Sequence, residues 1–188
     1  IQKALDLIVQ FVKAEGGALF LLDDKNNTLV CKASVGPVDI RGITLKTGEG
    51  IVGQCVAENS SRKVRDVQHD PDFDHSVDES TGFSTRSIVC APMVGHFEKI
   101  GAIELVNKSD ASGLFSDTDL LMLQTLASAA ALAISNAHMA DDLVAQERVS
   151  RELELATEMQ RSLLPAARPA PFPVCGINLP AYEMSGDF

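Results

Sequence analysis

Two long apolar runs near the middle of the chain constrain the fold most strongly. Residues 86–95 read RSIVCAPMVG and residues 99–108 read KIGAIELVNK, with only a short connection between them. Runs of this length that are rich in β-branched residues and joined tightly are typical of neighbouring antiparallel strands. The pair therefore predicts the central strands of an antiparallel sheet.

The first 35 residues predict a helix followed by a hairpin. Residues 1–14 carry apolar side chains on one face at helical spacing, and Gly16 and Gly17 are expected to end this helix. The apolar positions are Leu5, Ile8, Val9 and Val12. Residues 18–23 and 28–35 are two further apolar runs, and the Asp/Asn-rich turn between them is typical of a hairpin.

Residues 48–85 predict two short elements and one long loop. A short helix from Ile51 to Glu58 follows two glycines, and residues 63–67 form a short strand. Residues 68–85 are polar and rich in aspartate, which indicates a crossing loop with about one helical turn. With the central pair included, the chain predicts an α+β fold, an antiparallel sheet of five to six strands flanked by helices.

One long helix is predicted from about residue 116 to residue 164. Ser116 is a candidate N-cap, and Asp119 occupies the third helical position, where a capping box has its carboxylate. Residues 140–164 contain no Gly or Pro, and their apolar side chains form a narrow stripe that suits a helix–helix seam. The stripe consists of Val149, Leu153, Ala156, Met159 and Leu163. We expect this helix to pair with its twin in a homodimer.

The charge balance and the cysteines limit the class of protein. The formal net charge is −10, which argues against nucleic acid as a partner and against a polybasic membrane anchor. No uninterrupted apolar run reaches the roughly 18 residues of a membrane span. The cysteines follow no metal-binding spacing, so we expect buried single thiols in a reducing cytoplasm. They are Cys31, Cys55, Cys90 and Cys175.

Three stretches together resemble GAF domains, the small-molecule sensing modules of phosphodiesterases, cyclases and bacterial regulators. They are DESTGFSTRSIVCAP (78–92), IGAIELVNK (100–108) and FSDTD (115–119). The resemblance covers roughly residues 1–140 and includes the order of the elements. It implies the GAF fold and is closest in pattern to the cyclic-nucleotide-binding members.

Four residues match a motif of those members, and we interpret them as a structural clasp. They are Asn107, Lys108, Phe115 and Asp119, whereas Leu120 stands where the family has Glu. A Lys at a strand end and an Asp in the first turn of the next helix can pair and close the intervening loop. Such a pair supports a pocket without touching a ligand.

The resemblance also implies which residues would contact a ligand. They are Ile51, Val52, Phe73, Thr81, Thr85 and Glu104. The backbone at Ile51 and Val52 would lie near a phosphate, Phe73 against a purine, and Glu104 at the pocket floor. Guanine-binding members have an Asp where this chain has Ser34-Val35, so adenosine is favoured over guanosine. A different ligand and a ligand-free dimerisation scaffold stay open as alternatives.

The segment 152–188 resembles the entry to SpoIIE/RsbU-like phosphatases of the PPM (protein phosphatase 2C-like) family. Its helix pattern ends in LLP, a proline-rich turn follows, and the chain closes with SGDF. By this resemblance Asp187 would be a ligand of a catalytic Mn²⁺/Mg²⁺ pair. One Asp cannot hold two metals, so we expect no catalytic residues and no cofactor within these 188 residues.

The expected organisation has three parts. Residues 1–140 form a GAF sensor domain, 141–164 a linker and dimerisation helix, and 165–188 a proline-rich turn with the start of a phosphatase domain. Since Ile1 is not an initiator Met, we expect a fragment of a bacterial-type cytoplasmic serine/threonine phosphatase that acts on a phosphoprotein. A sensor predicts an open pocket at Thr81, Thr85 and Glu104, whereas a scaffold predicts that these side chains satisfy one another.

Overall fold

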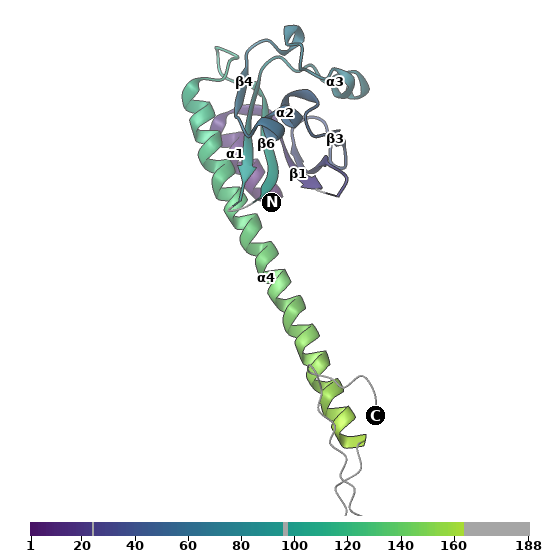
Figure 1. Ribbon diagram of the computed structural model, residues 1–188. Coiled ribbons are helices and arrows are strands. Elements are labelled where there is room, and N and C mark those ends of the chain that lie inside the picture. The colour runs from purple at the N-terminus through teal and green to yellow at the C-terminus, as the bar shows by residue number, and fades with distance from the viewer. Residues whose placement is uncertain (24, 96–97, 164–188) are drawn as a thin grey trace, which may run out of the picture. The chain divides into compact units, whose positions relative to one another are not determined.

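The domain is built on one six-stranded antiparallel sheet. The structure is a computed structural model, and it describes residues 1–23, 25–95 and 98–163. The strand order is β3-β2-β1-β6-β5-β4 (Figure 1). The strands are β1 (Ala14–Asp23), β2 (Thr28–Val35), β3 (Thr44–Lys46), β4 (Arg62–Val64), β5 (Ile88–Val94) and β6 (Lys99–Lys108). The two apolar runs that were predicted to be central are β5 and β6, and β6 pairs with both β1 and β5.

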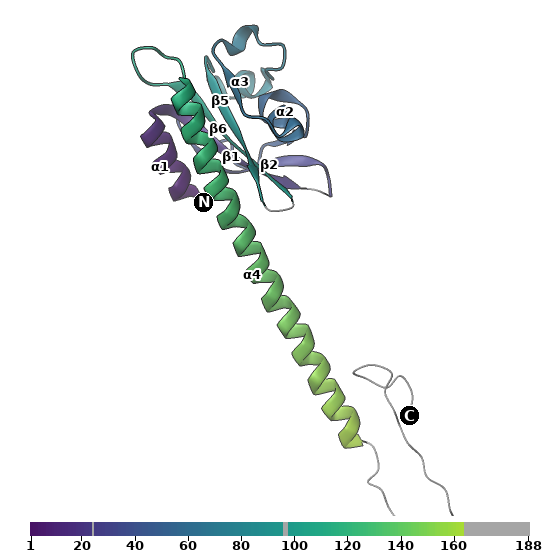
Figure 2. The same cartoon turned by 60° about the vertical axis from the view of Figure 1, so that its left-hand side comes forward.

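Helices cover both faces of the sheet. α1 and the N-terminal part of α4 lie side by side over one face, and α2 and α3 lie over the other (Figure 2). Each face has its own cluster of buried hydrophobic residues, with Val89 of β5 in one cluster and its neighbour Ile88 in the other. The helices are α1 (Gln2–Val12), α2 (Gly50–Glu58), α3 (Ser76–Thr81) and α4 (Asp117–Leu163), with a 3-10 turn at Val67–His69. The α+β fold predicted from the sequence is confirmed.

The junction between α1 and β1 differs from the prediction. The helix ends at Val12, and Lys13 adopts the left-handed conformation at φ 58°, so β1 begins at Ala14 and contains both glycines. Gly17 serves close packing instead: a Cβ there would lie 2.7 Å from Leu105 Cδ2 and 2.8 Å from Val9 Cγ2. Gly17 therefore lets α1 approach the sheet closely, and neither glycine terminates the helix.

The start of α4 has the predicted capping box. Ser116 Oγ accepts the Asp119 N–H at 3.2 Å, and Asp119 Oδ2 accepts the Ser116 N–H and hydroxyl, each at 2.8 Å. Because these contacts satisfy N–H groups that a helix leaves unpaired at its start, they fix where α4 begins.

The chain divides into two compact units, Ile1–Asn136 and Ala137–Phe188. Among the described residues, α4 is the one helix with an 18-residue window apolar enough to cross a membrane by length and composition, at a mean hydropathy of 1.5 with 22% of that window buried. A single helix of this kind is a weak indication, because core helices pass the same test. The predicted proline-rich turn, Asp187 and Cys175 lie outside the described residues.

Candidate ligand-binding pocket

A pocket opens between the sheet and the elements that cover its α2 face. Its empty volume is about 900 Å³, including open solvent at the mouth. The walls come from β1, β2, β5 and β6, the segment 36–45, the start of α2 and the segment 73–85. Phe20, Phe73 and Phe83 contribute aromatic surface to it. A concave site with mostly apolar walls suits a small organic ligand.

All six residues that the resemblance marked for ligand contact line this pocket. They are Ile51, Val52, Phe73, Thr81, Thr85 and Glu104. Ile51 and Val52 are buried in the first turn of α2, where peptide N–H groups have no partner within the helix. The positive end of the α2 dipole therefore borders the pocket, an arrangement that favours an anion or another acceptor.

Thr81 and Thr85 are held by α3 and not by each other. Thr81 Oγ1 donates to the Val77 carbonyl at 2.7 Å and accepts the Phe83 N–H at 3.3 Å. Thr85 donates its N–H and its hydroxyl to the Asp78 carboxylate, at 2.8 and 2.7 Å. Since Asp78 itself lines the pocket, this contact fixes the segment that forms the pocket wall on the α3 side.

Glu104 is a polar group without a partner among the described residues, on an otherwise apolar part of the sheet. It lies on β6 opposite Ala18 of β1 and Cys90 of β5. Within the part of the chain that the structure describes, no hydrogen bond or ion pair reaches its half-buried carboxyl group. Burial, assisted by the negative charge of Asp78, raises the pKa of Glu104 to about 7. At neutral pH this carboxyl group is therefore close to half ionised and available to a ligand.

The described residues that line the pocket include carboxylates but no Lys or Arg. Asp74 and Asp78 share the wall with Glu104. Hydrogen bonds from the Ser76 backbone and hydroxyl lower the pKa of Asp74, so it is ionised at neutral pH. A Cβ placed on Gly50 would lie 3.8 Å from Asp74 Cβ, which puts this acidic residue beside the start of α2. The side chains thus give the pocket a negative potential.

Ser34 and Val35, which were expected to stand at the base-reading position, line the pocket. The Ser34 hydroxyl is already used, since it donates to the Val38 carbonyl and accepts the Ile40 N–H, each at 3.3 Å. The wall at Ser34 and Val35 therefore contains no acidic side chain and no free hydroxyl group.

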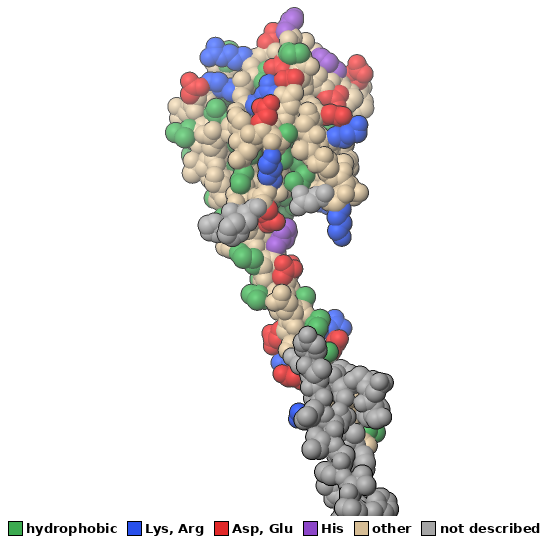
Figure 3. All heavy atoms as spheres, viewed as in Figure 1, with side chains coloured by type: hydrophobic (Ala, Val, Ile, Leu, Met, Phe, Trp, Pro, Cys, Tyr) green, Lys and Arg blue, Asp and Glu red, His purple; other side chains and the backbone are tan. Residues whose placement is uncertain are grey.

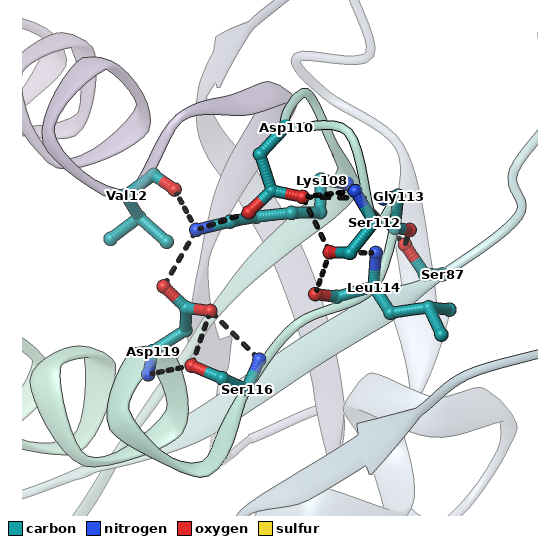
Figure 4. Close-up of polar contacts among 9 residues, drawn as sticks. All are labelled: Val12, Ser87, Lys108, Asp110, Ser112, Gly113, Leu114, Ser116 and Asp119. Atoms are coloured by element: carbon teal, nitrogen blue, oxygen red, sulfur yellow. Dashed lines mark hydrogen bonds and ion pairs between the residues drawn. The ribbon is translucent and has the colours of Figure 1, made fainter.

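Lys108 joins three elements at the end of β6. Its Nζ donates to Asp119 Oδ1 at 2.7 Å and to the Val12 carbonyl at 2.6 Å (Figure 4). It also lies 5.9 Å from the ring centroid of buried Phe115. Burial alone would raise the pKa of Asp119, but the hydrogen bonds from Lys108 and Ser116 outweigh it and lower that pKa. This ion pair ties β6 to the end of α1 and the start of α4.

Asn107 connects the same region to the pocket wall. It adopts a left-handed conformation at φ 54°, and its Oδ1 accepts the Arg86 N–H at 2.7 Å. Its Nδ2 donates to Glu15 Oε2 at 2.8 Å and to the Ser84 carbonyl at 2.9 Å. Asn107 therefore holds the backbone on both sides of Thr85. The structure brings the four clasp residues together at the end of β6, and none of them lines the pocket.

Sequence reasoning assigned no role to Asp78, which the structure places in the pocket wall, bonded to Thr85. Asp78 stands in the first turn of α3, a favoured position for a carboxylate. Its contact with Thr85 depends on a left-handed turn at Gly82. Spacing in the sequence does not reveal that turn. The signal that could have pointed to Asp78 was its position in the first turn of a helix.

A single antiparallel sheet with helices on both faces and a ligand-sized pocket on one of them defines a small α+β domain with an internal binding site. The GAF domain family matches residues 1–135, with the pocket entirely inside that range. The chain therefore belongs to the GAF domain family.

The chain is also similar to known proteins in sequence and in fold. A dual 3′,5′-cyclic-AMP and -GMP phosphodiesterase 11A of Takifugu rubripes is 30% identical over 148 residues, which cover 73% of this chain and 16% of that protein. The GAF domain of an Acinetobacter phosphoenolpyruvate-protein phosphotransferase has a similar fold, with a TM-score of 0.63 at 19% identity over 75% of this chain and 83% of that one. A free methionine-R-sulfoxide reductase of Neisseria meningitidis has a TM-score of 0.57 at 23% identity, covering 67% and 70%.

Proposed function

We propose that this GAF domain is a sensor module that binds a small organic ligand in the pocket. The unpartnered carboxyl group of Glu104 beside open space carries this proposal. A half-buried carboxyl group without a protein partner takes its hydrogen bonds from a ligand or from water. A pure scaffold would gain stability by filling this space with apolar side chains, so the pocket favours the sensor over the ligand-free scaffold.

Cyclic nucleotides are the first ligands to test, with adenosine ahead of guanosine. The similar phosphodiesterase is named for cyclic AMP and cyclic GMP. The N-terminus of α2 offers peptide N–H groups for a phosphate, and Phe73 offers a ring for a purine. The absence of a carboxylate at Ser34 and Val35 disfavours guanine.

Calorimetric titration of this chain with cyclic AMP is expected to give a Kd of about 10 μM or tighter. Thr85→Ala is expected to weaken binding at least about tenfold, because Asp78 loses the hydroxyl that fixes the pocket wall. Thr125→Ala is the matched control, since this exposed Thr bonds only to its own helix through the Leu121 carbonyl. No heat with cyclic AMP or cyclic GMP, on folded protein, would rule out cyclic nucleotides and leave another ligand or the scaffold.

We also propose that α4 pairs with its twin in a homodimer and carries the signal out of the domain. Hydrophobic side chains are exposed between charged ones along this helix (Figure 3). Within the stripe, Met159 and Leu163 are 66% and 76% exposed, which is unfavourable for a helix that stays single in water. A parallel pair would bury this stripe.

The dimer is testable by sedimentation equilibrium. We expect a dimer for the wild-type chain and a monomer for Leu153→Asp/Met159→Asp, because two charges in a narrow seam are strongly unfavourable. Leu155→Asp is the matched control: Leu155 is 54% exposed but lies off the stripe. A wild-type monomer, or equal weakening by the control, would contradict pairing through this seam.

The parent protein is proposed to be a PPM-type serine/threonine phosphatase that the sensor controls. The helix pattern of 152–165 and the final SGDF support this proposal. In protein extended beyond residue 188, Asp187→Ala should abolish Mn²⁺-dependent hydrolysis of a phosphoserine protein, because a metal ligand is lost. Asp141→Ala, at an exposed acidic residue of α4, should leave hydrolysis unchanged; a fully active Asp187→Ala protein would exclude this role.

A further inference from the structure

We propose that the ligand of this pocket presents a nitrogen with N–H bonds, either a protonated amine or an exocyclic amine, to the carboxylate of Glu104. This inference rests on the proposed function, namely that the pocket binds a small organic ligand. It adds the chemical class of the ligand and the residue that selects it.

The first argument is the state of Glu104 without a ligand. The carboxyl group lies on the central strand β6 between Ala18 and Cys90, two small neighbours that leave it room but give it no hydrogen bond. Among the described residues it has neither an ion pair nor a hydrogen bond. An ionised carboxylate accepts hydrogen bonds only, so the group that best satisfies it is a donor.

The second argument is the charge around it. Asp74 and Asp78 line the same pocket, and the described lining residues contain no Lys or Arg. Asp78 is occupied by Thr85, whereas Glu104 has no such partner. In a site with this negative potential, the most favourable interaction energy is available to a ligand nitrogen that has N–H bonds or a positive charge.

The third argument is the aromatic lining of the pocket. Phe20, Phe73 and Phe83 line the pocket and provide faces and edges for a flat apolar ring. An aromatic ring bearing an amine or amidine would place its ring against these side chains and its nitrogen at Glu104. Aromatic faces also attract the positive charge of an organic cation.

Proton linkage gives this contact a signature that a purely apolar ligand lacks. The titratable groups that face Glu104 are Asp78, Asp74, Cys31 and Cys90. Burial raises the pKa of Cys31 to about 11, and the hydrogen bond with Cys55 together with burial raises the pKa of Cys90 well above its ordinary value, so neither thiol ionises near neutral pH. Because the pKa of Glu104 is about 7, its carboxyl group is mostly protonated below that pH and must release the proton before it can pair with a cation. Affinity for a cation should therefore fall as the pH drops through 7.

The test uses two matched pairs of probes and follows methyl resonances of the pocket by NMR. Benzamidine and acetophenone have the same shape, but only benzamidine carries N–H bonds. Cyclic AMP and the cyclic monophosphate of purine riboside differ only in the exocyclic amine. In each pair we expect the N–H-bearing probe to bind at least about tenfold more tightly at pH 8. Benzamidine should bind about tenfold more weakly at pH 6 than at pH 8.

Glu104→Gln tests the residue, and Glu79→Gln, at an exposed acid of α3, is the matched control. Glu104→Gln should reduce the ratio of benzamidine affinity to acetophenone affinity to within about threefold and should remove the pH dependence of benzamidine binding. Glu79→Gln should change neither the ratio nor the pH dependence. If only benzamidine is preferred over its partner probe, the ligand nitrogen is a cationic amine. If only cyclic AMP is preferred over its partner probe, it is the exocyclic amine of a heterocycle. Equal binding of both members of both pairs would overturn the inference but keep the pocket as a ligand site. No shift with any probe would overturn both.

Discussion

Replacing Lys108 by Met is expected to lower the free energy of unfolding of the domain by about 3–5 kcal/mol. Met preserves the apolar stem but removes the ammonium group. The Asp119 carboxylate and the Val12 carbonyl then lose a donor in a buried site. Urea denaturation at neutral pH, followed by far-UV circular dichroism, measures this difference.

Lys63→Met is the matched control for this prediction. Lys63 also pairs with an Asp of the first turn of α4, but that partner, Asp117, is 93% exposed. The loss should therefore be about 1 kcal/mol or less. Lys108→Met/Asp119→Asn should recover part of the loss, because no unpaired charge is left buried and the Ser116 cap persists. Equal, small effects of Lys108→Met and Lys63→Met would show that the clasp does not hold the fold.

Glu104→Gln is expected to stabilise the domain at pH 8 and to have little effect near pH 4.5. The folded-state pKa of Glu104, about 7, lies above the ordinary value of 4.5. A carboxyl group with a raised folded-state pKa favours folding only below its unfolded pKa, and that contribution is lost as the pH rises through 7. The shift corresponds to at most about 3 kcal/mol, because one pKa unit is equivalent to about 1.4 kcal/mol. Urea denaturation across this pH range gives the curve for each variant.

Glu79→Gln again serves as the control, since this exposed side chain should leave the pH dependence of stability as it is in the wild type. Parallel stability curves for the wild type and Glu104→Gln would mean that Glu104 has a partner or is fully hydrated. That result would remove the main support for a ligand at this position.

The core elements of the fold could be predicted from the sequence because their signals are local. The apolar runs of β5 and β6 and the capping box of Ser116 and Asp119 each lie within a few residues of chain. β3 gave no such signal, since Thr44–Lys46 has three residues with one half-buried side chain, and only its pairing with β2 makes it a strand.

The start of β1 was mispredicted because the role of its glycines depends on packing against residues that are distant in the sequence. Gly17 packs against Val9 and Leu105, a contact that becomes visible only when α1 lies on the sheet. The same limit applies to the pocket. The resemblance placed Glu104 there correctly as a lining residue, but its lack of a partner depends on segments from four parts of the sequence that meet around it.

The central claim, that this GAF pocket is a ligand site, is tested most directly by methyl NMR spectra of the wild-type chain with cyclic AMP and benzamidine. The account predicts that the methyl groups of Ile51, Val52 and Ile88, which line the pocket, shift on titration. Those of Leu5 and Leu123, buried under α1 and α4 on the opposite face, should not shift. Unchanged spectra with both probes, or shifts confined to the α1–α4 face, would contradict the claim.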